Sequence, residues 1–236
     1  MATDNSAQGT QQQDDLDIAR QRLASVEAQL DPGTIRLLEA LGVANGWHCL
    51  EIGAGSGSIA AWLSRRVGTS GRILTMDVDT QFFDDRNLSN LEVRQHNLAT
   101  DELPESAFDL VHARWVLAHL RDRPAALRRM LSAVKPGGWL MVEEPDFANA
   151  RNASPLFRAI PNMDPFYGRL LYPDSRPLAL RDVGLEGRMT VPQQPDQFIL
   201  AGPITETNVA DQINLLDYST IIFPGPITFT VWGRRR

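Results

Sequence analysis

The fold of this chain is decided by the stretch Glu51-Ile52-Gly53-Ala54-Gly55-Ser56-Gly57. It follows the mostly apolar run Trp47-His48-Cys49-Leu50 and precedes the amphipathic run Ile59-Ala60-Ala61-Trp62-Leu63. This order predicts a strand, a glycine loop and a helix. Glycines at alternate positions allow a tight turn and allow a ligand to come close where a side chain would collide. An acidic residue stands two positions before the first glycine, where it can face a cation.

Strands and helices alternate on both sides of this stretch. Strands are predicted over 48–52, 72–76, 91–96, 108–113 and 139–143, and helices over 58–67, 80–88 and 125–134. Continuous apolar strands separated by helices indicate a parallel sheet covered on both faces. Right-handed crossovers then favour a doubly wound, Rossmann-like α/β fold.

The flanking segments are predicted as additions to this sheet. Residues 1–13 are polar and predict a disordered tail, and residues 14–46 predict an N-terminal helical cap in which Asp31-Pro32 separates two helices, Leu16–Leu30 and Pro32–Leu41. Residues 47–236 form the main domain, with acceptor-binding insertions expected at about 145–176 and 192–225. Further expected elements are helices over 177–183 and 210–216 and strands over 186–191 and 227–232.

Polar residues at the carboxyl ends of the strands are the candidates for a ligand site, because ligands of open α/β sheets bind there. Asp77 ends the second strand, where a carboxylate can accept both hydroxyls of a ribose. Asn97 follows the third strand, where its amide could address an adenine edge between Val78 and Leu98.

The pattern Glu-x-Gly-x-Gly-x-Gly resembles the first motif of the class I S-adenosylmethionine (SAM) methyltransferases. Residues 108–114 and the Lys135-Pro136-Gly137-Gly138 turn are similar to later motifs of that family, and Val231-Trp232-Gly233-Arg234 is similar to the ends of small-molecule enzymes from bacterial natural-product pathways. The resemblance implies a seven-stranded sheet whose last strand is antiparallel. It also implies SAM as cofactor and a small-molecule acceptor methylated at O, N or C. Taken with the glycine loop, it predicts cofactor contacts at Glu51, Gly53, Ala54, Gly55, Gly57, Asp77, Val78, Asn97, Leu98, Ala113 and Arg114.

Two other kinds of protein stay open at this point. An NAD(P)-dependent oxidoreductase needs Gly-x-Gly-x-x-Gly, whereas here the third glycine, Gly57, comes only two residues after Gly55. The spacing, and the acid at Glu51, favour SAM. A protein of this fold that binds SAM without transferring a methyl group is the other alternative.

The candidate catalytic residues are His119 and Glu144. His119 lies just past the fourth strand, where an imidazole could take a proton from the acceptor. Glu144 belongs to an acidic cluster after the fifth strand, in which repulsion could raise a pKa and create a base, or arginines could neutralise the charges. His112, within the fourth strand, is expected to be a buried, hydrogen-bonded histidine. No metal site is predicted, because the ligand set of the Mg²⁺-dependent catechol enzymes is not matched.

The composition limits the kinds of partner that the protein is expected to bind. The formal charge of −6 and the pI of about 5.2 argue against a broad nucleic-acid surface. One cysteine permits no disulfide within the chain, the polar start does not resemble a signal peptide, and no run of 18 apolar residues predicts a membrane span. These features predict a cytoplasmic enzyme with no nucleic-acid or membrane partner. A homodimer or higher oligomer is compatible with the sequence.

Overall fold

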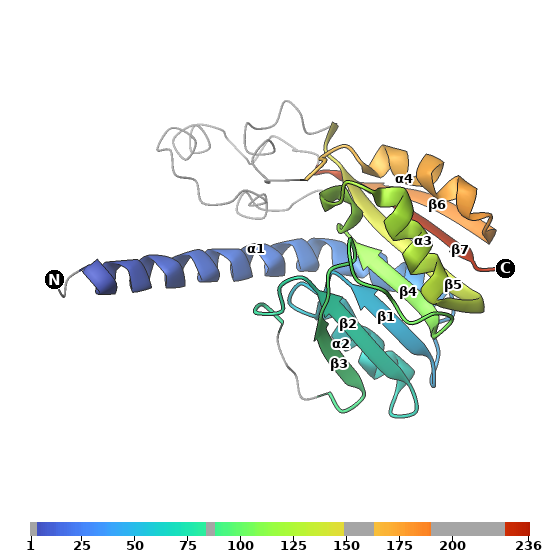
Figure 1. Ribbon diagram of the computed structural model, residues 1–236, viewed down its shortest axis with the longest axis horizontal. Helices are drawn as coiled ribbons and strands as arrows, with labels where there is room; N and C mark the ends of the chain where they lie inside the picture. Colours follow the sequence, from blue (N-terminus) through green and yellow to red (C-terminus); the bar gives the residue numbers. More distant parts are fainter. Residues whose placement is uncertain (1–3, 84–87, 149–162, 190–224) are drawn as a thin grey trace.

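A seven-stranded sheet forms the centre of the molecule in the computed structural model, which describes residues 4–83, 88–148, 163–189 and 225–236 (Figure 1). The strands are β1 His48–Ile52, β2 Arg72–Asp77, β3 Leu91–Gln95, β4 Phe108–Arg114, β5 Val134–Asp146, β6 Arg181–Met189 and β7 Ile227–Arg234. Their order across the sheet is β3-β2-β1-β4-β5-β7-β6.

The pairing confirms the predicted doubly wound sheet. Strands β1 to β5 pair in parallel, and β7 pairs antiparallel with both β5 and β6. The strand order reverses between β1 and β4, so a crevice opens outside the carboxyl ends of these two strands. This is the edge at which the glycine loop and the polar strand ends meet.

Two apolar cores lie on the two faces of the sheet. Neighbouring residues of β1 point to opposite faces, so that Cys49 enters one core and Leu50 the other, both with no exposed surface. The helices α1 Asp4–Ala40 and α2 Ser58–Val67 cover the Cys49 face. The helices α3 Arg123–Ala133 and α4 Gly168–Ser175 cover the Leu50 face. The short 3₁₀ helices η1 Leu117–His119 and η4 Arg176–Leu178 complete the helical elements described.

The N-terminal cap differs from its prediction. A single helix, α1, runs from Asp4 to Ala40 in place of a disordered tail and two helices, and its N-terminal part projects beyond the sheet (Figure 1). Pro32 lies inside it, although proline within a helix costs about 3 kcal/mol. Packing outweighs this cost, because Leu37 and Leu38 are buried against the sheet. The hydroxyl of Thr34 also donates to the Leu30 carbonyl at 3.3 Å.

Three local predictions are wrong or incomplete. Residues 80–83 form a turn, in which the Phe83 N–H donates to the Thr80 carbonyl at 3.1 Å, and not the start of a helix; residues 84–87 of the expected helix lie outside the described residues. The helix predicted over 177–183 is interrupted at Ala179, which has φ of 51°, and β6 begins at Arg181 to pair with β7. Helix α4 was not predicted.

Parts of the predicted insertions lie outside the described residues. These are 149–162 and 190–224, so the helix expected over 210–216 falls there as well. Among the residues that the structure does describe, no helix has the length and apolar content needed to cross a membrane.

Candidate functional site

A cavity of about 560 Å³ opens at the carboxyl ends of β1, β2 and β4, where the strand order reverses. Most of the residues predicted to contact the cofactor line it: Glu51, Gly53, Ala54, Gly55, Asp77, Val78, Asn97, Leu98 and Arg114. Helix α1 forms a further wall of the cavity, through Ala19, Leu23, Val26 and Glu27. The topology therefore brings together residues that are up to 144 positions apart in the chain, from Ala19 to Met163.

Gly53 and Gly55 of the glycine loop both have positive φ and differ in what a side chain there would meet. Gly53 has φ of +79°, and a Cβ there would come within 2.3 Å of the Val116 side chain. Gly55 has φ of +55°, and a Cβ there would meet only side chains of α1, Glu27 at 3.2 Å and Leu23 at 3.8 Å. A Cβ at Gly55 would therefore point toward α1 and narrow the space between the loop and that helix, both of which line the cavity.

Two of the predicted contacts do not line the cavity. Gly57 is the N-cap of α2 with φ of 92°, and a Cβ there would collide with the Phe83 ring at 2.5 Å, so its role is to form the turn. Ala113 has no exposed surface and packs in the core beside Val111, because the residue faces inward from β4. Neither residue is therefore expected to offer its side-chain position to a ligand, and a contact with the backbone around Ala113 stays a prediction.

Asp77 is held in place by the backbone around it. Its Oδ2 accepts a hydrogen bond from the Gly55 N–H at 3.2 Å, and its Oδ1 accepts one from the Asp79 N–H at 3.2 Å. These bonds fix the carboxylate at the end of β2 and link it to the glycine loop. On the same side of the cavity lie Asn97 and Leu98, together with Val78, which is 59% exposed.

Glu51 presents a second carboxylate to the cavity from the end of β1. It is 3% exposed, and its Oε2 lies 2.6 Å from Nδ1 of His112 on β4. Burial raises the pKa of Glu51, and the neighbouring His112 acts in the opposite direction. The expectation that His112 is buried and hydrogen-bonded is confirmed, with both ring nitrogens bonded to carboxylates.

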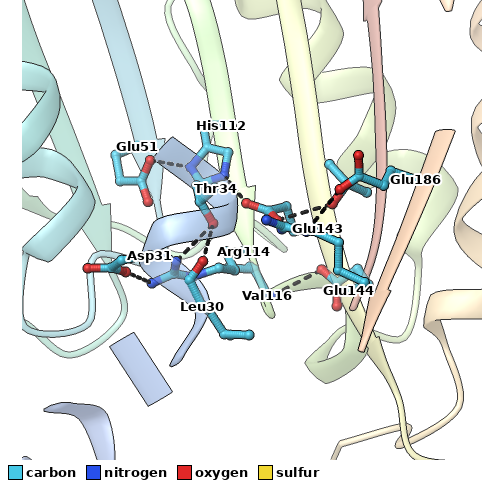
Figure 2. A network of polar contacts seen from close by, with 12 residues as sticks. Leu30, Asp31, Thr34, Glu51, His112, Arg114, Val116, Glu143, Glu144 and Glu186 are labelled. Atoms are coloured by element: carbon cyan, nitrogen blue, oxygen red, sulfur yellow. Dashed lines mark hydrogen bonds and ion pairs between the residues drawn. The ribbon is translucent and has the colours of Figure 1, made fainter. Parts of the chain in front are cut away.

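Arg114 fastens α1 over the site (Figure 2). Its guanidinium donates to Oγ1 of Thr34 at 3.0 Å and to Oδ1 of Asp31 at 2.8 Å. The guanidinium is therefore engaged with the helix as well as lining the cavity.

Glu27 of α1 is a residue that the sequence analysis did not identify. Its Oε1 accepts a hydrogen bond from the Ser56 N–H at 3.0 Å, and its other oxygen bonds the Ser56 hydroxyl. It lies 29 positions from its partner and within a long polar segment, so no local pattern distinguishes it from the other acidic residues of the helix.

The two catalytic candidates have different surroundings. His119, in η1, lines the cavity. Glu144 does not line the cavity and has no exposed surface. Its carboxylate accepts hydrogen bonds from the N–H groups of Val116, Leu117 and Ala118 at 2.7–3.1 Å, and Figure 2 shows the one from Val116. Burial raises the pKa of Glu144 to about 8, and the three N–H groups hold back that rise. Glu144 is therefore corrected from a catalytic candidate to the residue that fixes the loop after β4.

The residues present fit SAM. An open glycine backbone at Gly55, a fixed carboxylate at Asp77 and a second carboxylate at Glu51 match a ligand with a ribose and a cationic amino-acid tail. Among the described residues, no three His, Cys, Asp or Glu side chains converge in a way that would hold a metal ion.

Comparison with known proteins assigns the family. Residues 18–181 match the methyltransferase-domain family. The chain belongs to this family. The resemblance to class I SAM-dependent methyltransferases is thereby confirmed.

Individual relatives cover the chain unevenly. Methyltransferase str3 of Strobilurus tenacellus is 38% identical over 103 residues, which are 43% of this chain and 36% of the relative. The ubiquinone/menaquinone biosynthesis C-methyltransferase UbiE of Vibrio vulnificus is 26% identical over 179 residues, 72% of this chain and 66% of the relative. The chain thus matches about a third to two thirds of the length of these relatives. A SAM-dependent methyltransferase from Aquifex aeolicus has the same fold, with a TM-score of 0.56 at 16% identity over 85% of this chain and 88% of that one.

Proposed function

We propose that this methyltransferase transfers the methyl group of SAM to an O, N or C atom of a small, largely apolar acceptor. The observation that carries the proposal is the cavity at the reversal of strand order, which joins the open glycine loop to the Glu51 and Asp77 carboxylates. These residues would hold the cofactor, with Asp77 facing the ribose and Glu51 the ammonium of the amino-acid tail. When bound, SAM supplies an electrophilic methyl group on a sulfonium sulfur.

The apolar lining supports an apolar acceptor. Beyond the carboxylates, the wall is formed by Leu23 and Val26 of α1, by Val116 and Leu120 after β4, and by Met163. Such a wall keeps water away from the acceptor and offers few hydrogen-bonding groups to a charged or sugar-like acceptor. Holding the acceptor atom in line with the methyl group can account for about 7–11 kcal/mol of the barrier.

His119 is proposed as the residue that takes the acceptor's proton, since its side chain lines the same cavity. A positioned base contributes about 10²–10⁴-fold to such a reaction. An acceptor that is already nucleophilic would not need it.

The wider setting is also proposed. The acidic net charge of −6 supports a small molecule as acceptor over a nucleic acid. The single cysteine, Cys49, is buried and free, which fits a reducing cytoplasm. A natural-product pathway is proposed from the similarity of Val231-Trp232-Gly233-Arg234 to the ends of small-molecule enzymes from such pathways.

The test is methyl transfer from radiolabelled SAM to a panel of phenols, quinols, amines and enolisable ketones. Transfer to at least one apolar member is expected, with His119→Asn lowering kcat at least 100-fold on a phenolic acceptor and leaving the dissociation constant of SAM unchanged. His96→Asn is the matched control, since His96 lines the cavity on the Asn97 side and its ring bonds the Glu102 carbonyl. Binding of SAM without methyl transfer to any of these acceptors would instead favour a protein that binds SAM without catalysing transfer.

A further inference from the structure

A buried row of polar side chains crosses the sheet behind the cavity (Figure 2). It begins at Glu51 on β1 and continues through His112 on β4 to Glu143 on β5. Glu143 also contacts Thr230 on the next strand, β7, and Arg188 on β6 beyond it. All of these residues lie on the face that α1 and α2 cover. Glu51 is the member that reaches the cavity.

The contacts in this row are close. The two ring nitrogens of His112 lie 2.6 Å from Oε2 of Glu51 and 3.1 Å from Oε1 of Glu143. The second oxygen of Glu143 accepts from Thr230 Oγ1 at 3.1 Å and is bonded to the Arg188 guanidinium. His112, Glu143 and Thr230 have no exposed surface.

The chemistry of the ring explains the arrangement. Only an imidazolium can donate from both of its nitrogens at once. Two buried carboxylates on either side of one ring also need a cation between them, because unpaired buried charges are strongly destabilising. Burial by itself lowers the pKa of His112, but Glu51 and Glu143 reverse that effect and raise it to about 9. Burial raises the pKa of Glu143, but the hydrogen bond and charge of His112, together with the charges of Arg114 and Arg188, outweigh burial and lower the pKa to about 2.

We propose that His112 is a positioning residue for the amino-acid tail of the cofactor: its imidazolium keeps the Glu51 carboxylate charged and oriented at the cavity wall, while Glu143 and Arg188 anchor the ring from behind. The inference depends on SAM binding and not on methyl transfer. It gives His112 a part in cofactor affinity although the ring has no exposed surface and does not line the cavity.

The test replaces His112 with asparagine and compares three ligands by calorimetry. SAM and S-adenosylhomocysteine carry the amino-acid tail, and 5′-methylthioadenosine lacks it. His112→Asn is expected to weaken the binding of the first two about tenfold or more, the scale of a lost hydrogen bond to a charged group, and to change the third less than twofold. His48→Asn, a substitution at a histidine outside the cavity lining, should change none of them. Equal weakening of all three ligands, or no weakening of any, would overturn the proposal.

The pH dependence separates positioning from mere support of the fold. The charged groups that face the His112 ring are Glu51 and Glu143. Arg114 acts on both of these carboxylates and is itself paired with Asp31 of α1, and Arg188 of β6 acts on Glu143. Without the imidazolium, the pKa of Glu51 rises further, so the carboxylate becomes neutral as the pH falls. The ratio of variant to wild-type dissociation constants for SAM should therefore be largest at pH 6 and decrease toward pH 8.5. A ratio that does not change with pH would contradict the proposal.

A measurement on the unaltered chain covers the case in which His112→Asn does not fold. The chain has four histidines, and ¹⁵N spectra of the imidazole rings can be assigned by substituting the other three. The expected result is a His112 ring with protons on both nitrogens at pH 7, with and without S-adenosylhomocysteine. A neutral ring with one unprotonated nitrogen would refute the proposal.

Discussion

Replacing Gly55 with alanine should separate cofactor binding from folding. The added Cβ would lie 3.2 Å from the Glu27 carboxylate and 3.8 Å from Leu23, both flexible side chains, so the fold can accommodate it. The remaining structural cost is the left-handed backbone, φ of +55°, which costs a non-glycine residue about 1–2 kcal/mol. The same Cβ would narrow the space between the glycine loop and α1, which both line the cavity, and we expect it to obstruct the cofactor.

Gly42→Ala provides a matched control for that backbone cost. Gly42 has φ of +81°, and a Cβ there would have no neighbour within 4 Å. Both variants should therefore lose about 1–2 kcal/mol of unfolding free energy in urea titrations. Only Gly55→Ala should lose SAM affinity, by about 1–3 kcal/mol for an overpacked contact, which corresponds to about 5- to 150-fold in the dissociation constant.

The refuting outcome is specific. If folded Gly55→Ala bound SAM as tightly as the wild type in calorimetric titrations, the glycine loop would not approach the cofactor, and the assignment of the cavity would be wrong. Equal affinity losses in Gly55→Ala and Gly42→Ala would instead assign the effect to stability.

Three further predictions concern single contacts of the site. Asp77→Asn should weaken both SAM and 5′-methylthioadenosine about 10- to 100-fold in calorimetry, because both ligands carry the ribose; unchanged binding of either would remove the ribose assignment. Glu144→Gln should leave the affinity for SAM unchanged in calorimetry, because Glu144 does not line the cavity. Burial raises the pKa of Glu144 in the folded chain to about 8, from an ordinary 4.5. The contribution of Glu144 to the free energy of unfolding is therefore complete below pH 4.5 and is lost as the pH rises toward 8. Glu144→Gln should reduce that decline, and an undiminished decline would count against the prediction. Arg114→Gln should speed hydrogen exchange of the amides around Asp31 and Thr34 at least fivefold by mass spectrometry, and unaltered exchange would show that Arg114 does not fasten α1.

The central sheet could be predicted because its signals are local. Strand β1 is an apolar run that ends in glycines, and the polar residues Asp77 and Asn97 directly follow strands. Parallel topology then brings these strand ends to one edge. Nine of the eleven predicted cofactor contacts consequently line the cavity.

What could not be predicted depends on contacts distant in sequence. Helix α1 continues through Pro32 because Leu37 and Leu38 pack on the sheet, and no propensity within the helix contains that information. Glu27 reaches the glycine loop only because α1 crosses it.

Glu144 was assigned a catalytic role for a similar reason. Its acidic side chain at a strand end is compatible with either a base or a structural acceptor, and only the fold brings the N–H groups of Val116 and Leu117 to it. The segment 177–183 is also too short for its apolar pattern to distinguish a helix from a strand. Pairing with β7 decides in favour of the strand from Arg181 onward.

Whether the cavity is a SAM site can be measured by calorimetric titration of the chain with SAM and, separately, with NADH. We expect saturable binding of one SAM per chain and no binding of NADH, because the glycine spacing and the pair of carboxylates at Glu51 and Asp77 suit a nucleoside with a cationic tail and not a pyrophosphate. Binding of NADH, or the absence of SAM binding by the folded chain, would contradict it.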